Sequence, residues 1–304
     1  MPFITTDDGI KLHVEETGQG EAIVFVHEFA ADVRSWTQQM AWFGRTHRCI
    51  AFNARGYGPS DVPEKDESYG QARAADDIAA VIKGLSLSRA HVVGLSMGAF
   101  ATLHFGIRHP ELARSLVIAG CGVGADPRTK DEVVQHVHAL AEEVLAKGMP
   151  HIAQAVGVGS TRLQLLNKDK AGWERFVAEC SEHSAQGAAL TLRNCQAKRP
   201  SIFDLGPQLA KIETPTLILS GDEDDACLEP SIFMKQMILT SQLGVIPGSG
   251  HAINLEEPAI FNEMVERLIS LVERGLWRAR DVRTIGGPAF PIAIERTASK
   301  EERA

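Results

Sequence analysis

Short apolar runs rich in β-branched residues recur along this chain, with helix-like stretches between them. The runs comprise residues 22–27, 49–53, 90–93, 115–119, 216–220 and 243–246. Several are apolar at every position rather than at alternate positions. A strand has this pattern when both of its faces are covered, as in a mainly parallel sheet with helices on each side. The sequence therefore predicts an α/β fold with a mostly parallel central sheet flanked by helices.

The stretches between these runs carry helical periodicity. Residues 75–85 and 260–271 place apolar side chains at helical spacing, and the second stretch follows Pro258, a residue favoured in the first turn of a helix. Near the start of the chain, Asp8 and Gly9 separate two short extended runs, which predicts an antiparallel hairpin at the edge of the sheet.

The strand pattern is interrupted once, between about residues 125 and 206. Helical stretches fill this region and are broken at Gly148-Met149-Pro150 and near Gly187, which predicts an inserted helical cap. The expected units are residues 1–124 as the first part of the core, 125–206 as the cap, 207–274 as the second part of the core and 275–304 as a C-terminal extension. The extension has no sustained periodicity, so its sequence predicts no role for it.

The most informative motif is GLSMG, which places Ser96 between Gly94 and Gly98. An apolar run precedes it and a helix-like run extends from Met97 to about His109, the context of a G-x-S-x-G nucleophile elbow. A nucleophile on so sharp a turn needs flanking positions without side chains, because strand and helix nearly touch there. Such a hydroxyl lies above the carboxyl ends of the strands, where open α/β sheets bind ligands. Ser96 is therefore the candidate nucleophile.

A serine hydroxyl is a poor nucleophile unless a base, oriented by a carboxylate, lies within hydrogen-bond reach. His251 follows the last strand-like run on a loop of small residues, so it is the predicted base. Four acidic residues, 222–225, follow the run before it. The chain order is thus serine, acid, histidine.

Three motifs in this order, GLSMG, GDED and GSGHAINLEEP, resemble the α/β-hydrolase fold family over roughly residues 3–274. The resemblance implies that the acid is Asp224, three residues after the glycine of the G-x-x-D turn. Asp222 and Asp225 lie close enough in sequence to be alternatives. Asp126, after the SLVIAG run, is the alternative for a variant arrangement.

Acyl transfer also requires an oxyanion hole, normally two backbone N–H groups. Met97, directly after the nucleophile, is the first predicted donor. The resemblance implies that the second donor follows a His-Gly pair, which places Phe29 of VFVHEFAADVRSW in that position, but Glu28 replaces the glycine. Glu28 has two interpretations: it ties down the loop by hydrogen bonds to neighbouring N–H groups, or it contacts substrate, disfavouring anionic substrates, or holds the water for deacylation.

Other polar and aromatic side chains carry weaker expectations. Arg55 and Asp61 in AFNARGYGPSDVP are expected to tie the scaffold together rather than contact substrate. Four apolar residues are candidates either for pocket walls or for ordinary packing: Trp36, Met149, Trp173 and Phe176. His136 and His138 have a spacing poorly suited to chelation from one helix face, so no metal is predicted.

The elbow, the C-terminal motif and the short cap look similar to those of bacterial arylesterases and enol-lactone hydrolases. The resemblance implies a serine hydrolase that cleaves a small carboxylic ester or lactone through an acyl-enzyme on Ser96, without a cofactor. One alternative is a carbon–carbon bond hydrolase of β-diketone type, although Ala252 stands where those enzymes commonly have tryptophan. Another is a non-catalytic ligand-binding protein with the same fold.

Charge and composition bear on partners. The chain has 31 basic and 39 acidic residues, a net charge of −8 and no basic cluster, which argues against nucleic-acid binding. It lacks a long apolar stretch and a signal-like start, so we expect a cytoplasmic protein that does not span a membrane. Five scattered cysteines favour buried, reduced thiols. The expected partner is a small molecule, and the sequence leaves open whether the protein is a homo-oligomer.

Overall fold

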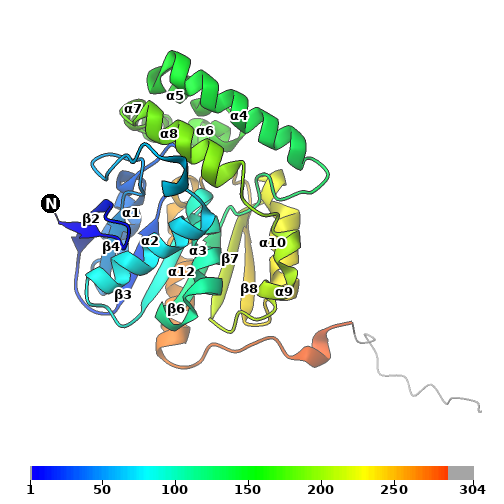
Figure 1. The fold of residues 1–304 in the computed structure, drawn as a ribbon. Coiled ribbons are helices and arrows are strands. Elements are labelled where there is room, and N and C mark those ends of the chain that lie inside the picture. Colours follow the sequence, from blue (N-terminus) through cyan, green and yellow to red (C-terminus); the bar gives the residue numbers. More distant parts are fainter. Residues whose placement is uncertain (1, 287–304) are drawn as a thin grey trace, which may run out of the picture.

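The computed structural model describes residues 2–286 of the 304-residue chain. Their strands form one eight-stranded sheet in the order β1-β2-β4-β3-β5-β6-β7-β8 (Figure 1). The strands are β1 (Phe3–Thr5), β2 (Lys11–Thr17), β3 (Ala22–Val26), β4 (Arg48–Phe52), β5 (Ala90–Leu95), β6 (Ala113–Ala119), β7 (Thr216–Gly221) and β8 (Ser241–Ile246). β2 pairs antiparallel with both β1 and β4, and all other neighbours are parallel. The predicted fold class and the edge hairpin are confirmed.

Helices cover both faces of the sheet, which explains the fully apolar strands. In β3, Val24 and Val26 pack on the side of α2 (Gln71–Gly84) and α3 (Met97–Arg108). Ile23 and Phe25 point the other way, towards α1 (Thr37–Phe43) and α12 (Pro258–Glu273). The remaining helices outside the cap are α9 (Gly206–Leu209), α10 (Asp225–Met237) and α11 (Ile253–Glu256). Because strand side chains alternate between faces, two covered faces require apolar residues at every position.

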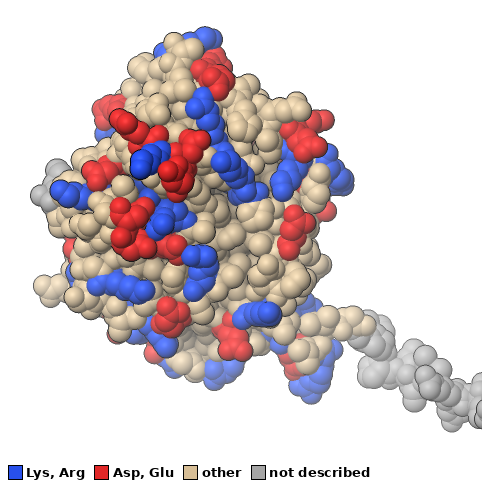
Figure 2. Space-filling model, in the orientation of Figure 1, with Lys and Arg blue, Asp and Glu red and all other residues tan. Residues whose placement is uncertain are grey.

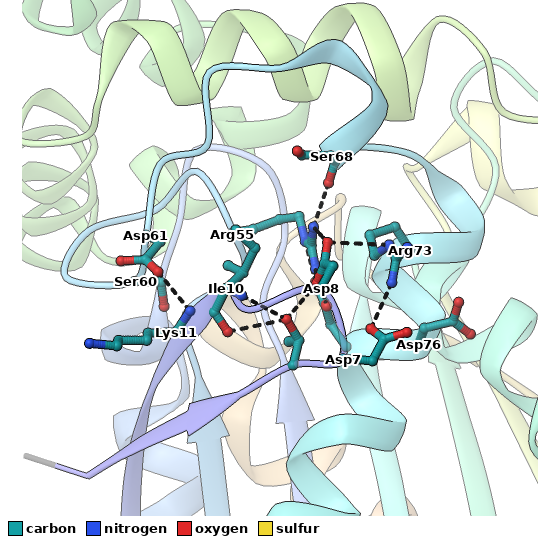
Figure 3. Close-up of polar contacts among 12 residues, drawn as sticks. Asp7, Asp8, Ile10, Lys11, Arg55, Ser60, Asp61, Ser68, Arg73 and Asp76 are labelled. Carbon is teal, nitrogen blue, oxygen red and sulfur yellow. Dashed lines mark hydrogen bonds and ion pairs between the residues drawn. The ribbon is translucent and has the colours of Figure 1, made fainter.

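A buried arginine joins the N-terminal hairpin to the core (Figure 3). The guanidinium of Arg55 donates to Asp77 of α2 at 2.6 Å and to Asp8 in the hairpin turn at 2.8 Å. Nearby, the carboxylate of Asp61 accepts a hydrogen bond from the backbone N–H of Lys11 at 2.7 Å. Arg55 and Asp61 thus tie segments of the scaffold together, as the sequence predicts.

The helical cap lies between β6 and β7 in the chain and above the carboxyl ends of the strands (Figure 1). Its helices are α4 (Lys130–Lys147), α5 (Met149–Gly157), α6 (Leu163–Lys168), α7 (Lys170–Ser181) and α8 (Ala185–Thr191), followed by a π-helical turn at Leu192–Gln196. The cap has its own apolar cluster, which also includes Ala30 and Ala31 from the loop after β3. The cap is therefore packed on that loop.

The start of the predicted C-terminal extension contacts the core. The indole N–H of Trp277 donates to the carbonyl oxygen of Thr240 at 2.8 Å, and the backbone N–H of Arg280 donates to Leu239 at 2.8 Å. Both acceptors lie just before β8. Residues 287–304 of the extension lie outside the described residues.

Acidic and basic side chains are interspersed on the face of the molecule in Figure 2. All five cysteines are buried and unbridged, which confirms the prediction of free thiols. Within residues 2–286, none of the helices combines the length and the apolar character needed to cross a bilayer.

Candidate active site

Parallel strand ends bring the predicted site residues to one edge of the sheet. Val26 at the end of β3 is paired with Gly94 of β5, and Leu95 with Ala119 at the end of β6. β7 continues the series next to β6 and β8 next to β7. Since parallel strands end at the same edge, the loops that carry Phe29, Ser96, Asp224 and His251 are neighbours although they are distant in sequence.

Ser96 lies on a strained turn between β5 and α3. Its φ of 54° and ψ of −114° are unfavourable for a residue with a side chain. A Cβ atom at Gly94 would overlap the carbonyl oxygen of Gly98, and one at Gly98 would overlap that of Val26. The backbone N–H of Ser96 donates to the carbonyl oxygen of Ala119 at 2.8 Å, which holds the turn. The predicted need for glycine at both flanking positions is confirmed.

His251 and Asp224 form a buried hydrogen-bonded pair. The Nδ1 atom of His251 lies 2.7 Å from Oδ2 of Asp224, and the two residues are 4% and 7% exposed. Burial alone would raise the pKa of Asp224, but the hydrogen bond and charge of His251 outweigh it, so the pKa lies below its ordinary value. An ionised Asp224 accepts a hydrogen bond from the N–H at Nδ1 of His251. The opposite nitrogen, Nε2, is then free to accept a proton.

The alternative aspartates are placed elsewhere. Asp222 is exposed and accepts a hydrogen bond from the backbone N–H of Ser249 at 3.0 Å. Asp225 is exposed at the start of α10, and Asp126 pairs with the exposed side chain of Arg128 at 2.7 Å. Among these acids, it is Asp224 that the structure joins to His251.

The Ser96 turn and the imidazole are linked through the end of β6. Ser96 bonds to Ala119, and a Cβ atom at the next residue, Gly120, would lie 3.4 Å from both Nδ1 and Cε1 of His251. The imidazole therefore lies against the residue that follows the Ser96 contact. Among the hydrogen bonds of the described residues, none joins the Ser96 hydroxyl to His251.

Glu256 holds the histidine loop, a role that the sequence interpretation missed. Its carboxylate accepts hydrogen bonds from the backbone N–H groups of Gly250 at 2.6 Å and Ala252 at 3.0 Å, one on each side of His251. The signal was present in the motif GHAINLEEP, where Glu256 lies five residues after the histidine. A carboxylate at that spacing can reach back to the loop that precedes its own short helix.

Cys227 is a second neighbour that was not predicted. Its Sγ atom lies 4.0 Å from His251 Nδ1, and Asp224, Cys227 and His251 form a group whose potential ligand atoms lie within 4.8 Å of one another. Burial raises the pKa of the Cys227 thiol well above its ordinary value, so the sulfur stays protonated at neutral pH. Nδ1 of His251 is already engaged by Asp224 at 2.7 Å, so the thiol lies beside an existing hydrogen-bonded pair.

The loop after β3 presents the second candidate oxyanion donor. The backbone N–H of Ala54 donates to Nε2 of His27 at 3.0 Å, so the ring proton is on Nδ1, which donates to the carbonyl oxygen of Glu28 at 2.8 Å. Burial lowers the pKa of His27 to about 4, which keeps the ring neutral. In a trans peptide the C=O and N–H point in opposite directions. His27 therefore orients the peptide that carries the N–H of Phe29.

The carboxylate of Glu28 points to the cap. Its Oε2 atom lies 2.5 Å from Nη2 of Arg162, and each side chain is 2% exposed. Hydrogen bonds from neighbouring N–H groups, one of the two expectations for Glu28, are not among the bonds of the described residues; the partner is Arg162. Because the charge of Glu28 is paired with that of Arg162, the two side chains together carry no net charge. The other oxygen, Oε1, is buried without a partner, so the predicted water contact remains a prediction.

The candidate wall residues divide between packing and a cavity. Trp36 is part of the core, with its ring 5.1 Å from that of Phe25, and Met149 and Trp173 belong to the apolar cluster of the cap. Phe176 lines a cavity of about 230 Å³ between the cap and the loop after β3. The other apolar walls of this cavity are Ala30, Ala31, Leu165 and Leu255. His136 and His138 are exposed on α4.

The family of this chain follows from comparison with known proteins. The family model described as the alpha/beta hydrolase family matches residues 23–264, most of the chain. The protein belongs to the alpha/beta hydrolase family. Among alpha/beta hydrolase relatives, 3-oxoadipate enol-lactonase 1 of Acinetobacter baylyi is 28% identical over 276 residues, which cover 89% of this chain and 97% of that protein.

Solved alpha/beta hydrolases have the same fold. A thermophilic esterase from Thermogutta terrifontis has a TM-score of 0.79 at 26% identity, with 89% of this chain and 98% of the esterase covered. The enol-lactonase from Burkholderia xenovorans has a TM-score of 0.77 at 20% identity, with 88% and 100% covered. This alpha/beta hydrolase thus resembles enzymes of the ester and lactone type along nearly its whole described length.

Proposed function

We propose that this protein is a serine hydrolase that cleaves a small carboxylic ester or lactone through an acyl-enzyme on Ser96. His251 accepts the proton of the Ser96 hydroxyl as the oxygen attacks the carbonyl carbon, and Asp224 stabilises the imidazolium that forms. The N–H groups of Phe29 and Met97 bind the oxyanion. Proton transfer from His251 then releases the alcohol. A water molecule, deprotonated by the same imidazole, hydrolyses the acyl-enzyme and frees Ser96.

The observation that carries this proposal is the buried His251–Asp224 hydrogen bond at 2.7 Å, next to a serine on a strained elbow. The bond leaves Nε2 unprotonated, which a base that activates serine requires. In unliganded enzymes the serine–histidine hydrogen bond is often long and tightens when substrate binds. As the first backbone N–H of α3, Met97 has no partner within the helix and is available to an oxyanion.

The substrate class of the proposal rests on the relatives. Enol-lactonase and esterase are the activities in the names of the similar proteins described above. The cavity of about 230 Å³ between the cap and the loop after β3 does not include Ser96 or His251 in its lining, so it does not define the size of the substrate. The mechanism needs no cofactor, because serine supplies the nucleophile and water completes the cycle.

Active-site labelling and turnover test the proposal together. The purified protein should hydrolyse p-nitrophenyl acetate, and a fluorophosphonate should increase the mass of the peptide that contains Ser96. Ser96→Ala should abolish the label and reduce kcat by about a millionfold. The control, Ser270→Ala on α12, should behave like the wild type. No label and no turnover would favour the ligand-binding alternative, and turnover of a β-diketone acid but not of esters or lactones would favour carbon–carbon bond hydrolysis.

A further inference from the structure

A buried ion pair lies directly next to a proposed oxyanion donor. Glu28 precedes Phe29 in the loop after β3, and Arg162 belongs to the cap. Both charges are almost completely removed from water and approach within 2.5 Å. Because both lose their hydration, such a pair often contributes no more stability than apolar residues of similar volume. The pair lies at the boundary between cap and core. A role in positioning the loop after β3 explains this place better than a contribution to the stability of the fold.

Contacts within the cap hold Arg162 in place. Its Nη1 atom donates to the carbonyl oxygen of Thr161 at 2.8 Å, and its guanidinium lies 4.4 Å from the centre of the Phe176 ring. These two contacts fix the plane of the guanidinium and leave Nη2 directed at Glu28. The position of the Glu28 side chain consequently depends on the position of the cap.

The loop that contains Glu28 needs such support. Ala30 has a positive φ of 65°, a conformation that is unfavourable for a residue with a side chain and persists where surrounding contacts enforce it. His27 holds the carbonyl oxygen of Glu28 at 2.8 Å, and Arg162 holds its carboxylate. Contacts at both ends of Glu28 fix the peptide plane that includes the Phe29 N–H.

We propose that Arg162 is a positioning residue of the oxyanion hole. By binding Glu28 it fixes the direction of the Phe29 N–H, so this donor is in place when the cap is seated on the core. This role accounts for a glutamate at the position where the family resemblance implies glycine. The inference rests on the proposed serine hydrolase function, because an oxyanion donor matters only if an oxyanion forms. A misplacement of about 1 Å in such a site lowers the rate about a hundredfold.

Arg162→Met tests the inference through a separation of kcat from KM. We expect kcat for p-nitrophenyl acetate to fall about tenfold to a hundredfold, with KM changed less than about threefold. A trifluoromethyl ketone, which forms an oxyanion on Ser96, should bind more weakly by a similar factor. The matched control is Arg193→Met, which removes an arginine that pairs at 2.6 Å with the exposed Glu142 within the cap. The control should keep wild-type kcat and inhibitor affinity.

A double variant separates positioning from the cost of an unpaired buried charge. The double variant Glu28→Gln/Arg162→Met removes both charges, so neither is left buried without a partner. If the single variant Arg162→Met does not fold, the double variant takes its place in the test. Positioning predicts that the double variant still has a reduced kcat and weak inhibitor binding. Wild-type values in the double variant would overturn the inference, as would a lower Tm in Arg162→Met with kcat and inhibitor affinity unchanged. Absence of Ser96 labelling in the wild type would instead overturn the proposed function.

Discussion

Three buried carboxylates of the candidate site have different hydrogen-bond or ion-pair partners, and the partner decides the role of each carboxylate. Asp224 accepts from an imidazole, Glu256 from two backbone N–H groups, and Glu28 pairs with an arginine. Burial raises the pKa of Glu256, whereas the contact with His251 brings the pKa of Asp224 below its ordinary value. Only Asp224 combines ionisation with a bond to a base, which is what the acid of a triad requires.

Asp224→Asn should therefore cost far more activity than stability. An amide that replaces the carboxylate no longer favours the proton on Nδ1 of His251, so the wrong tautomer faces Ser96, and we expect kcat to fall about ten-thousandfold. Steady-state kinetics with p-nitrophenyl acetate and a thermal unfolding curve measure the two effects. Asp222→Asn, on the neighbouring exposed carboxylate, serves as the control and should stay within about threefold of wild type. Equal losses in the two variants would contradict the assignment of Asp224.

At the scale of secondary-structure elements, two features hold the scaffold: the close approach of α3 to β3 and the buried ion pairs of Arg55. α3 lies so close to the end of β3 that a side chain at Gly98 would overlap the backbone of Val26. The N-terminal hairpin is held to α2 by Arg55, which is 4% exposed and pairs with Asp77 and Asp8. The first feature sets how closely α3, which follows Ser96, approaches β3, and the second ties the edge hairpin to α2.

Gly98→Ala should disturb the elbow. The added methyl group must push α3 away from β3, and such overpacking costs about 1–3 kcal/mol of unfolding free energy, with a larger effect on Ser96 geometry and kcat. Urea unfolding and kinetics measure the two. Gly206→Ala is the control, since a methyl group there would make only ordinary contacts with Phe233 and Met237. Unchanged stability and kcat in Gly98→Ala would show that the helix has room to move.

Arg55→Met should lower the free energy of unfolding by about 3–5 kcal/mol, because it leaves the buried carboxylate of Asp77 without its partner. Denaturant titration measures this loss. Arg73→Met is the comparison: Arg73 pairs with the exposed Asp7 at 2.8 Å, and loss of such a pair costs about 0–1 kcal/mol. Similar losses in the two variants would mean that burial of the Arg55 pair has no energetic consequence.

At the scale of the whole molecule, the cap and the core are linked by contacts between residues distant in sequence. Arg162 binds Glu28, and Nε2 of His183 lies 3.1 Å from the carboxylate of Asp32. Both core partners lie in the segment that contains the proposed oxyanion donor. The cap also reaches the other side of the site, because Gln164 donates to Glu223 and Lys168 pairs with Glu257. Movement of the cap would therefore affect both the oxyanion loop and the segments next to Asp224 and His251.

Buried neutral histidines should make the stability of the whole protein depend on pH. Burial lowers the pKa values of His27, His91 and His104 to about 4, 3 and 4, from an ordinary value of 6.5. Between about pH 4 and 6.5 the unfolded chain therefore binds more protons than the folded protein, so the free energy of unfolding rises with pH in this window and declines as pH falls below 6.5.

Denaturant unfolding at a series of pH values measures this dependence. In the same window His104→Gln should reduce the slope by about one proton per molecule, because one histidine no longer titrates on unfolding. A free energy of unfolding that stays constant from pH 6.5 to 4 would contradict the prediction.

Much of the fold and part of the site could be predicted from local pattern. The fully apolar runs predicted a sheet covered on both faces because strand side chains alternate, and the glycines around Ser96 predicted a turn too tight for side chains. The ends of strands depend on pairing as well as on local pattern. β5 extends to Leu95 rather than ending at Val93, because pairing with β6 supplies backbone hydrogen bonds through the glycine. Local composition cannot anticipate bonds that a neighbouring strand supplies.

The sequence by itself determined the order of the elements and the glycine-flanked turn at Ser96, and it predicted His251 as the base, because each depends on residues close together in the chain. The tertiary structure decided which aspartate meets His251, that Glu256 holds its loop, and that Glu28 binds the cap. These pairings join segments far apart in sequence. A charged side chain takes whichever partner the packing brings within about 3 Å once water is excluded, and packing is a property of the whole chain.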